Sequence, residues 1–66
     1  MQIIVNGKTK ELEEETLLAD LVNELGYAES SVAVVIDGRL WPRSKWNQKL
    51  LVDGQCLEFV SPMQGG

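Results

Sequence analysis

The sequence contains no histidine and a single cysteine, Cys56. Without histidine, the chain lacks the commonest general base and the commonest metal ligand in proteins. One cysteine cannot form a disulfide within the chain, and it cannot supply the several thiolates that hold a zinc ion or an iron–sulfur cluster. Because the chain is also short, we expect it to perform no catalysis of its own.

Long apolar runs are also missing, and no basic amino terminus precedes an apolar stretch. We therefore expect no membrane span and no signal peptide, and by default a cytoplasmic location. Acidic residues outnumber basic ones by 10 to 6, which gives a net charge of −4. Basic and aromatic residues are not interleaved, so nucleic acid is not expected as a partner, whereas a protein with a basic docking surface is.

The chain has 66 residues, of which 44% are hydrophobic, and this predicts one small globular domain over residues 1–66. A domain of this size buries only about 60% of its unfolded surface, so its packing must be careful. The segment "MQIIV" is rich in β-branched residues and, as a strand, places Met1, Ile3 and Val5 on one face. "NG" is a strong hairpin turn signal, and "KTKEL" can return beside the first strand. These patterns predict a β-hairpin from Met1 to about Leu12.

The next segment predicts a helix over about Leu17–Leu25. Thr16 is a candidate N-cap, and three glutamates at 13–15 precede the positive end of the helix. Gly26 is a natural stop. The expected buried stripe, at helical spacing, consists of Leu18, Leu21, Val22 and Leu25.

The second half of the chain reads as three further strands. The apolar "VAVVI" suits an interior strand, "RLW" can pair back after an Asp-Gly turn, and a helical turn is expected from Ser44 onward. After another Asp-Gly turn, "CLEFV" predicts a last strand with Leu57 and Phe59 directed inward. The order β-β-α-β-β-β predicts an α+β domain in which one helix crosses a small mixed sheet, the β-grasp shape.

The chain ends in "SPMQGG", and the glycines Gly65 and Gly66 have no side chain that could pack. We expect residues 61–66 to form a flexible tail that reaches at most ~20 Å beyond the last strand. Such a tail could bring the terminal carboxylate into a partner's pocket. The apolar residues Val60, Pro62 and Met63 lie next to it in sequence and are candidate docking residues.

Taken over its whole length, the sequence resembles the ThiS-type sulfur carriers of thiamine biosynthesis, which are ubiquitin-like β-grasp proteins. The resemblance rests on "MQIIVNG", "LVNELG", "VAVVIDGRLWPRSKW" and "LVDGQCLEFVSPMQGG". Pro42-Arg43 followed by Trp46 favours this family over the small subunits of molybdopterin synthase, which share the fold and the tail. Three positions depart from the family pattern: Asp37, where asparagine is common; Trp41, which replaces a smaller apolar residue; and Gln55, where an acidic residue usually follows Asp-Gly.

The resemblance implies a reaction sequence at the carboxyl end. An E1-like adenylyltransferase of the ThiF type would use ATP and magnesium to adenylate Gly66, while the carrier itself binds no cofactor. A persulfide on a sulfurtransferase or cysteine desulfurase would then attack, and reduction would leave a thiocarboxylate on Gly66. A thiazole synthase of the ThiG type would take the sulfur, so this chain would be a protein co-substrate.

Other interpretations of the same residues stay open at this point. A ubiquitin-like interaction or conjugation module could use Gly66 to form an isopeptide bond, and a carrier could serve molybdopterin or another sulfur-containing product. Arg43 and Lys45 could contact a nucleotide or an acidic partner patch, or could lie in an ordinary solvated loop. Cys56 has no basic neighbour in sequence, which favours an inert strand residue. Trp46 is expected to pack over the edge of the core.

Overall fold

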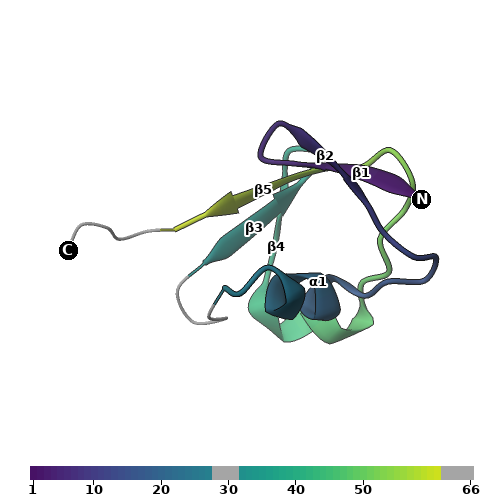
Figure 1. Ribbon diagram of the computed structural model, residues 1–66. Coiled ribbons are helices and arrows are strands. Elements are labelled where there is room, and N and C mark those ends of the chain that lie inside the picture. Colours follow the sequence, from purple (N-terminus) through teal and green to yellow (C-terminus); the bar gives the residue numbers. More distant parts are fainter. Residues whose placement is uncertain (28–31, 62–66) are drawn as a thin grey trace.

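The computed structural model describes residues 1–27 and 32–61 (Figure 1). Within these residues, one mixed sheet has the strand order β2-β1-β5-β3-β4. Strands β1 and β5 pair in parallel, and the other neighbouring strands pair antiparallel. The strands are β1 (Gln2–Val5), β2 (Lys8–Glu11), β3 (Ala33–Ile36), β4 (Arg39–Trp41) and β5 (Cys56–Val60).

Two helical segments cover the same face of this sheet (Figure 1). They are the α-helix α1 (Leu18–Glu24) and the 3₁₀-helix η2 (Arg43–Gln48), which begins one residue before the predicted turn. The predicted helix is one residue too long at each end, because Leu17 and Leu25 are its caps. The predicted α+β class and ubiquitin-like β-grasp fold are confirmed.

The start of α1 differs from the prediction that Thr16 caps it. The Thr16 hydroxyl donates to the carbonyl oxygen of Glu13 at 2.7 Å, and the N-cap is Leu17, which makes no side-chain capping bond. Instead, the backbone N–H of Leu18 donates to the carbonyl oxygen of Lys49 at 2.8 Å. A partner far away in sequence thus satisfies one of the free N–H groups that every helix start presents.

The core lies between the sheet and the two helical segments. Three of the four predicted stripe residues of α1, Leu18, Leu21 and Val22, are fully buried, and Leu25 is partly buried against the same core. Trp46 was expected at the edge of the core, but it is only 2% exposed and belongs to its centre. The remaining buried core residues are Ile3, Leu12, Ala19, Val32, Val34, Ile36, Leu51, Leu57 and Phe59.

Side chains of two turns fasten β5 into the sheet. The N–H of Phe59 donates to Oδ1 of Asn6 at 2.8 Å, and the N–H of Asn6 donates to the carbonyl of Leu57 at 2.9 Å. On the other edge of the strand, the N–H of Cys56 donates to Oδ1 of Asp37 at 2.9 Å. Asn6 and Asp37 both have positive φ angles, of 49° and 51°, which asparagine and aspartate tolerate better than most residues. These bonds extend the pairing of β5 beyond the regular ladder.

Replacing Leu21 with alanine tests the contact between helix and sheet. Leu21 is fully buried, so we expect Leu21→Ala to lower the free energy of unfolding by ~2–5 kcal/mol, a large part of the stability of so small a domain. Urea unfolding followed by circular dichroism measures this loss. Val52→Ala, at a position 56% exposed, is the matched control and should change stability little. Equal midpoints for the two variants would contradict the assigned core.

Candidate functional site

The end of strand β5 is the part of the described structure that lies nearest in sequence to the carboxyl end (Figure 1). Val60, the last residue of β5, pairs with Ala33 of β3 and is 49% exposed. One residue further, at Ser61, the described part of the chain ends. The candidate residues of the tail, which are Pro62, Met63, Gly65 and Gly66, lie outside the described residues.

Alternation along β5 is as predicted and anchors the base of the tail. Leu57 and Phe59 are buried, whereas Cys56, Glu58 and Val60 are exposed on the opposite face. The ring of Phe59 stacks on that of Tyr27, with centroids 5.1 Å apart and planes 15° from parallel. The ring stacking and the bonds on both edges hold the strand up to its penultimate residue, directly before the candidate tail residues in sequence.

The sheet face away from α1 is open, since no helix among residues 1–27 and 32–61 covers it (Figure 1). On this face Glu58 stands beside Val35, which in turn pairs with Leu40 of β4. Leu40 is 63% exposed. The apolar residues Val60, Val35 and Leu40 therefore lie on the same sheet face as the carboxylate of Glu58, near the end of β5. Exposed apolar surface of this kind is typical of protein–protein contact.

Cys56 lies on this open face and is exposed. The hydrogen bond from its backbone to Asp37 places a carboxylate beside it, whereas a reactive thiolate needs a basic neighbour or a helix N-terminus. Among the described residues, no group of three histidine, cysteine, aspartate or glutamate side chains could hold a metal ion. In the same residues, no helix is long and apolar enough to cross a membrane. The inert role predicted for Cys56 agrees with these surroundings.

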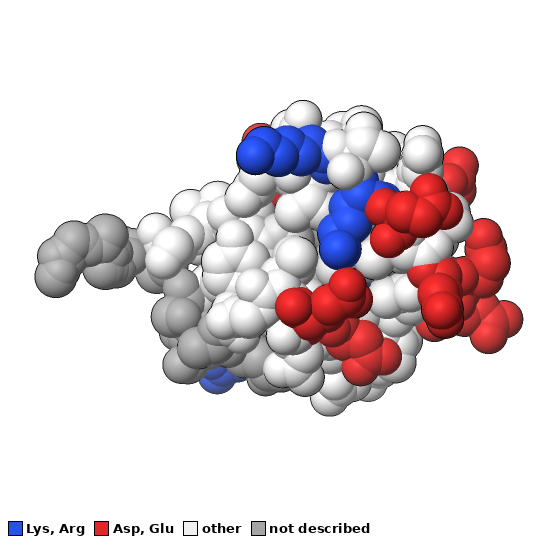
Figure 2. Space-filling model, viewed as in Figure 1, with Lys and Arg blue, Asp and Glu red and all other residues white. Residues whose placement is uncertain are grey.

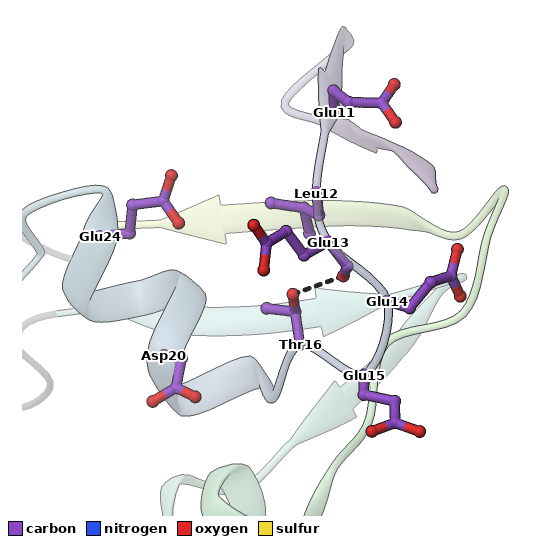
Figure 3. Close-up of a pocket in the computed structure, with 8 residues that line it drawn as sticks. All are labelled: Glu11, Leu12, Glu13, Glu14, Glu15, Thr16, Asp20 and Glu24. Atoms are coloured by element: carbon purple, nitrogen blue, oxygen red, sulfur yellow. Dashed lines mark hydrogen bonds between the residues drawn. The ribbon is translucent and has the colours of Figure 1, made fainter.

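A hollow of about 420 Å³ lies between the exit of the hairpin and α1 (Figure 3). Its carboxylates point in different directions rather than toward one centre. Glu11 and Glu14 reach the amino group of Met1 at 3.2 and 3.5 Å, and Glu24 pairs with Lys10 at 3.3 Å. The hollow is lined by Glu11, Leu12, Glu13, Glu14, Glu15, Thr16, Asp20 and Glu24.

The ion pairs of the hollow change the titration of the amino terminus. The hydrogen bond to Glu11, with the charges of Glu11 and Glu14 in addition, raises the pKa of the Met1 amino group above its ordinary value of 8.0. Carboxylates in this hollow therefore have a structural role: they hold the start of β1 against the chain that leaves β2. In the view of Figure 2, most of the visible acidic side chains lie at the end of the molecule opposite the end of β5.

This raised pKa predicts a pH dependence of stability. The charged amino group favours the folded state, so its contribution is fully present below about pH 8 and is lost as the pH rises through the raised folded pKa. Glu11→Gln should flatten this alkaline loss, while Glu58→Gln, which is remote from Met1, should keep it. Thermal denaturation between about pH 7 and about pH 10 measures the difference. If the stability of the two variants falls equally with rising pH, the ion pair between Met1 and Glu11 contributes nothing to stability.

A mixed sheet with a helix on one face, whose interior last strand carries the carboxyl end, defines this molecule as a ubiquitin-like β-grasp protein. The model of the ThiS family matches residues 3–66, and the chain belongs to the ThiS family.

Two solved structures are similar over the whole of this chain. A crystal structure of the thiamine biosynthesis protein ThiS from Geobacter metallireducens is 29% identical, with a TM-score of 0.85 and complete coverage of both chains. A solution structure of a thiamine biosynthesis protein from the same organism is also 29% identical, with a TM-score of 0.81 and 88% of its chain covered. No curated protein matches the sequence.

The family predicted from the sequence is thus confirmed, while the roles of the individual site residues stay predictions. The structure places Val60 at the end of β5 as an exposed apolar residue, as the docking hypothesis requires. Sequence reasoning missed Asn6 and Asp37, which fasten the strand before the tail. Both residues precede a glycine in a turn motif, and this motif predicts their backbone conformation. It does not predict the hydrogen bonds that their side chains make to β5.

Proposed function

We propose that this protein is a sulfur carrier for thiazole formation in thiamine biosynthesis and that it carries sulfur as a thiocarboxylate on Gly66. The main support is membership of the ThiS family over residues 3–66, a match that includes the Gly-Gly end. Both similar structures from Geobacter metallireducens are of thiamine biosynthesis proteins.

Chemistry explains why such a carrier needs a partner enzyme. A terminal carboxylate has a pKa near ~3.5, so at neutral pH it is ionised and resists attack. An E1-like adenylyltransferase would join it to AMP with ATP and magnesium, releasing pyrophosphate. A persulfide sulfur on a sulfurtransferase or cysteine desulfurase would attack the acyl carbon, and AMP would leave. A thiol would then cleave the resulting acyl disulfide, leaving the thiocarboxylate for a thiazole synthase.

The folded domain contributes recognition and not catalysis in this proposal. Gly65 and Gly66 lack a β-carbon, so the acyl group can be approached closely and the backbone can follow a narrow channel. The rigid base of the tail at β5 limits the region that the terminal carboxylate can explore. We expect these reactions to take place in the cytoplasm, where ATP is available.

Deletion of Gly66 tests the reacting position. It moves the carboxylate back by about 3.5 Å, and a displacement of even about 1 Å at a reacting centre can cost on the order of a hundredfold in rate. The shortened chain should keep its fold and fail to gain sulfur, and valine at position 66 should fail too. Cys56→Ser, the matched control, should react like the original protein. The measurement is intact mass after incubation with adenylating enzyme, ATP, magnesium and a sulfur donor.

Two outcomes would contradict this mechanism. Sulfur on the shortened chain would exclude Gly66 as the only site, and loss of sulfur from Cys56→Ser would make Cys56 the carrier. Conjugates with other proteins, formed in a cell extract in place of an exchange of oxygen for sulfur, would favour the ubiquitin-like modifier.

Charged substitutions at Val60 and Met63 test the predicted docking residues. Each carboxylate would have to be desolvated against the enzyme, so we expect Val60→Asp and Met63→Asp to weaken binding of the adenylating enzyme by about tenfold or more. Val52→Asp is the matched control, since Val52 is equally exposed but lies in the segment before β5. Calorimetric titration gives the affinities, and circular dichroism checks the fold. Unchanged affinity for both docking variants would refute their role.

A further inference from the structure

A second hollow, of about 220 Å³, lies at the edge of the sheet between β4 and η2, and we name it the β4–η2 groove. Buried Val32 and Trp46 contribute to its walls, while Leu40 and Arg43 are exposed there. Its lining residues are Val32, Ala33, Leu40, Trp41, Pro42, Arg43 and Trp46. Three of these residues, Pro42, Arg43 and Trp46, belong to the Pro-Arg-x-x-Trp segment. The reactions proposed at the tail give this segment no role.

The groove is prearranged, and its edge is closed to an added strand. The indole Nε1–H of Trp46 donates to the carbonyl oxygen of Trp41 at 2.9 Å, and the next residue, Pro42, has no N–H. Strand β4 is at the edge of the sheet, but its end therefore has neither a free acceptor at Trp41 nor a donor after it. The end of β4 is therefore less suited to an added strand, and the hollow beside it is suited to a side chain.

The segment that carries β4 and η2 is rich in cations, in contrast to the molecule as a whole; Arg43 lines the groove, and Glu58 is the carboxylate on the neighbouring open face. Four of the six lysines and arginines lie between positions 39 and 49, and no acidic residue lies between Asp37 and Asp53. Among the described residues, none of these four makes an ion pair. Lys49 holds its Nζ 5.0 Å from the centre of the Trp41 ring, which lines the groove. The four residues are Arg39, Arg43, Lys45 and Lys49.

An apolar hollow beside cations that make no ion pair with residues 1–27 or 32–61 is complementary to an apolar side chain flanked by carboxylates. In the view of Figure 2 most of the visible carboxylates lie at the end of the molecule opposite the end of β5, whereas Glu58 lies on β5 itself. Because cations near a low-dielectric wall attract anionic groups over several ångströms, Arg43 would orient such a partner as well as bind it.

The position of the groove identifies the partner. Ala33 lines the groove and is also the direct neighbour of Val60, from which the tail departs. The tail reaches at most ~20 Å from this point, so a protein that binds Gly66 in its active site must lie close to the groove. The first enzyme to do so in the proposed function is the adenylating enzyme, since it alone binds the carboxylate in its unmodified form.

We propose that the β4–η2 groove receives an apolar side chain flanked by carboxylates on the adenylating enzyme, with Arg43 as the cation that pairs with them. This docking role rests on the proposed function. It assigns to the Pro-Arg-x-x-Trp segment a contact with the enzyme that adjoins Val60 through Ala33 and lies outside the tail.

Charge reversal at Arg43 tests the proposal, with Lys8→Glu as the matched control. Lys8→Glu makes the same change in net charge as Arg43→Glu, but Lys8 lies on β2, at the opposite edge of the sheet. By calorimetry, Arg43→Glu should weaken binding of the adenylating enzyme by about tenfold, while Lys8→Glu stays within about twofold. Raising the salt from about 0.05 M to about 0.3 M should narrow this difference, because screening weakens the charge pair.

Leu40→Ser tests the apolar part of the groove without changing charge, and Val52→Ser is its control at an equally exposed position. The first variant should weaken binding severalfold and the second should not. Normal affinity for both Arg43→Glu and Leu40→Ser would overturn the proposal. If the original protein still forms its thiocarboxylate in that case, the proposed function stands and only the groove is excluded.

If the original protein is neither bound nor converted by the adenylating enzyme, the proposed function fails and the docking partner fails with it. Sedimentation of the protein alone detects a different occupant: self-association that Arg43→Glu abolishes would assign the groove to a second copy. Tryptophan fluorescence that changes on deleting residues 62–66, with no enzyme present, would assign it to the chain's own end. Either result would overturn the proposal.

Discussion

Pairing of strand β5 on both of its edges is the interaction on which the rest of this structure depends. The last strand of the chain is placed in the interior of the sheet, parallel to β1 and antiparallel to β3. Both inward residues, Leu57 and Phe59, are buried in the core, and Asn6 and Asp37 add side-chain bonds at the two ends of the strand. The carboxyl end of the chain thereby follows, in sequence, an element that is bonded on both edges and packed into the core.

The two faces of the sheet have different roles because one is covered and the other is not. α1 and η2 close the core from one side, and burial of Trp46 ties η2 into it. The opposite face stays open around Glu58 and Val60, beside the end of β5. Charge is divided in a similar way, with carboxylates around the hairpin exit and α1, and cations along β4 and η2. The described part of the domain thus presents surfaces of different chemistry, with apolar residues beside the end of β5 and carboxylates around the hairpin exit.

Local signals predicted most elements, and they failed where a distant segment supplied the partner. The helix stripe, the hairpin and the alternation of "CLEFV" follow from spacing alone, because burial on one face imposes a period on the sequence. Thr16 looked like an N-cap, yet the backbone of Lys49 takes the bond that a cap would have made. Trp46 looked like an edge residue, yet the 3₁₀ turn after Pro42 directs it into the core, where Trp41 accepts its N–H.

The sequence by itself determined which elements form, which of their faces are apolar, and that the chain ends in two bare glycines suited to a reacting carboxyl group. It also determined the family, because the motifs extend over the whole chain. Only the tertiary structure decided the strand order that places β5 in the interior, the use of Asn6 and Asp37 to fasten it, and the groove between β4 and η2. These features depend on contacts between residues far apart in the chain. The local sequence around a residue does not specify which distant residues it will contact.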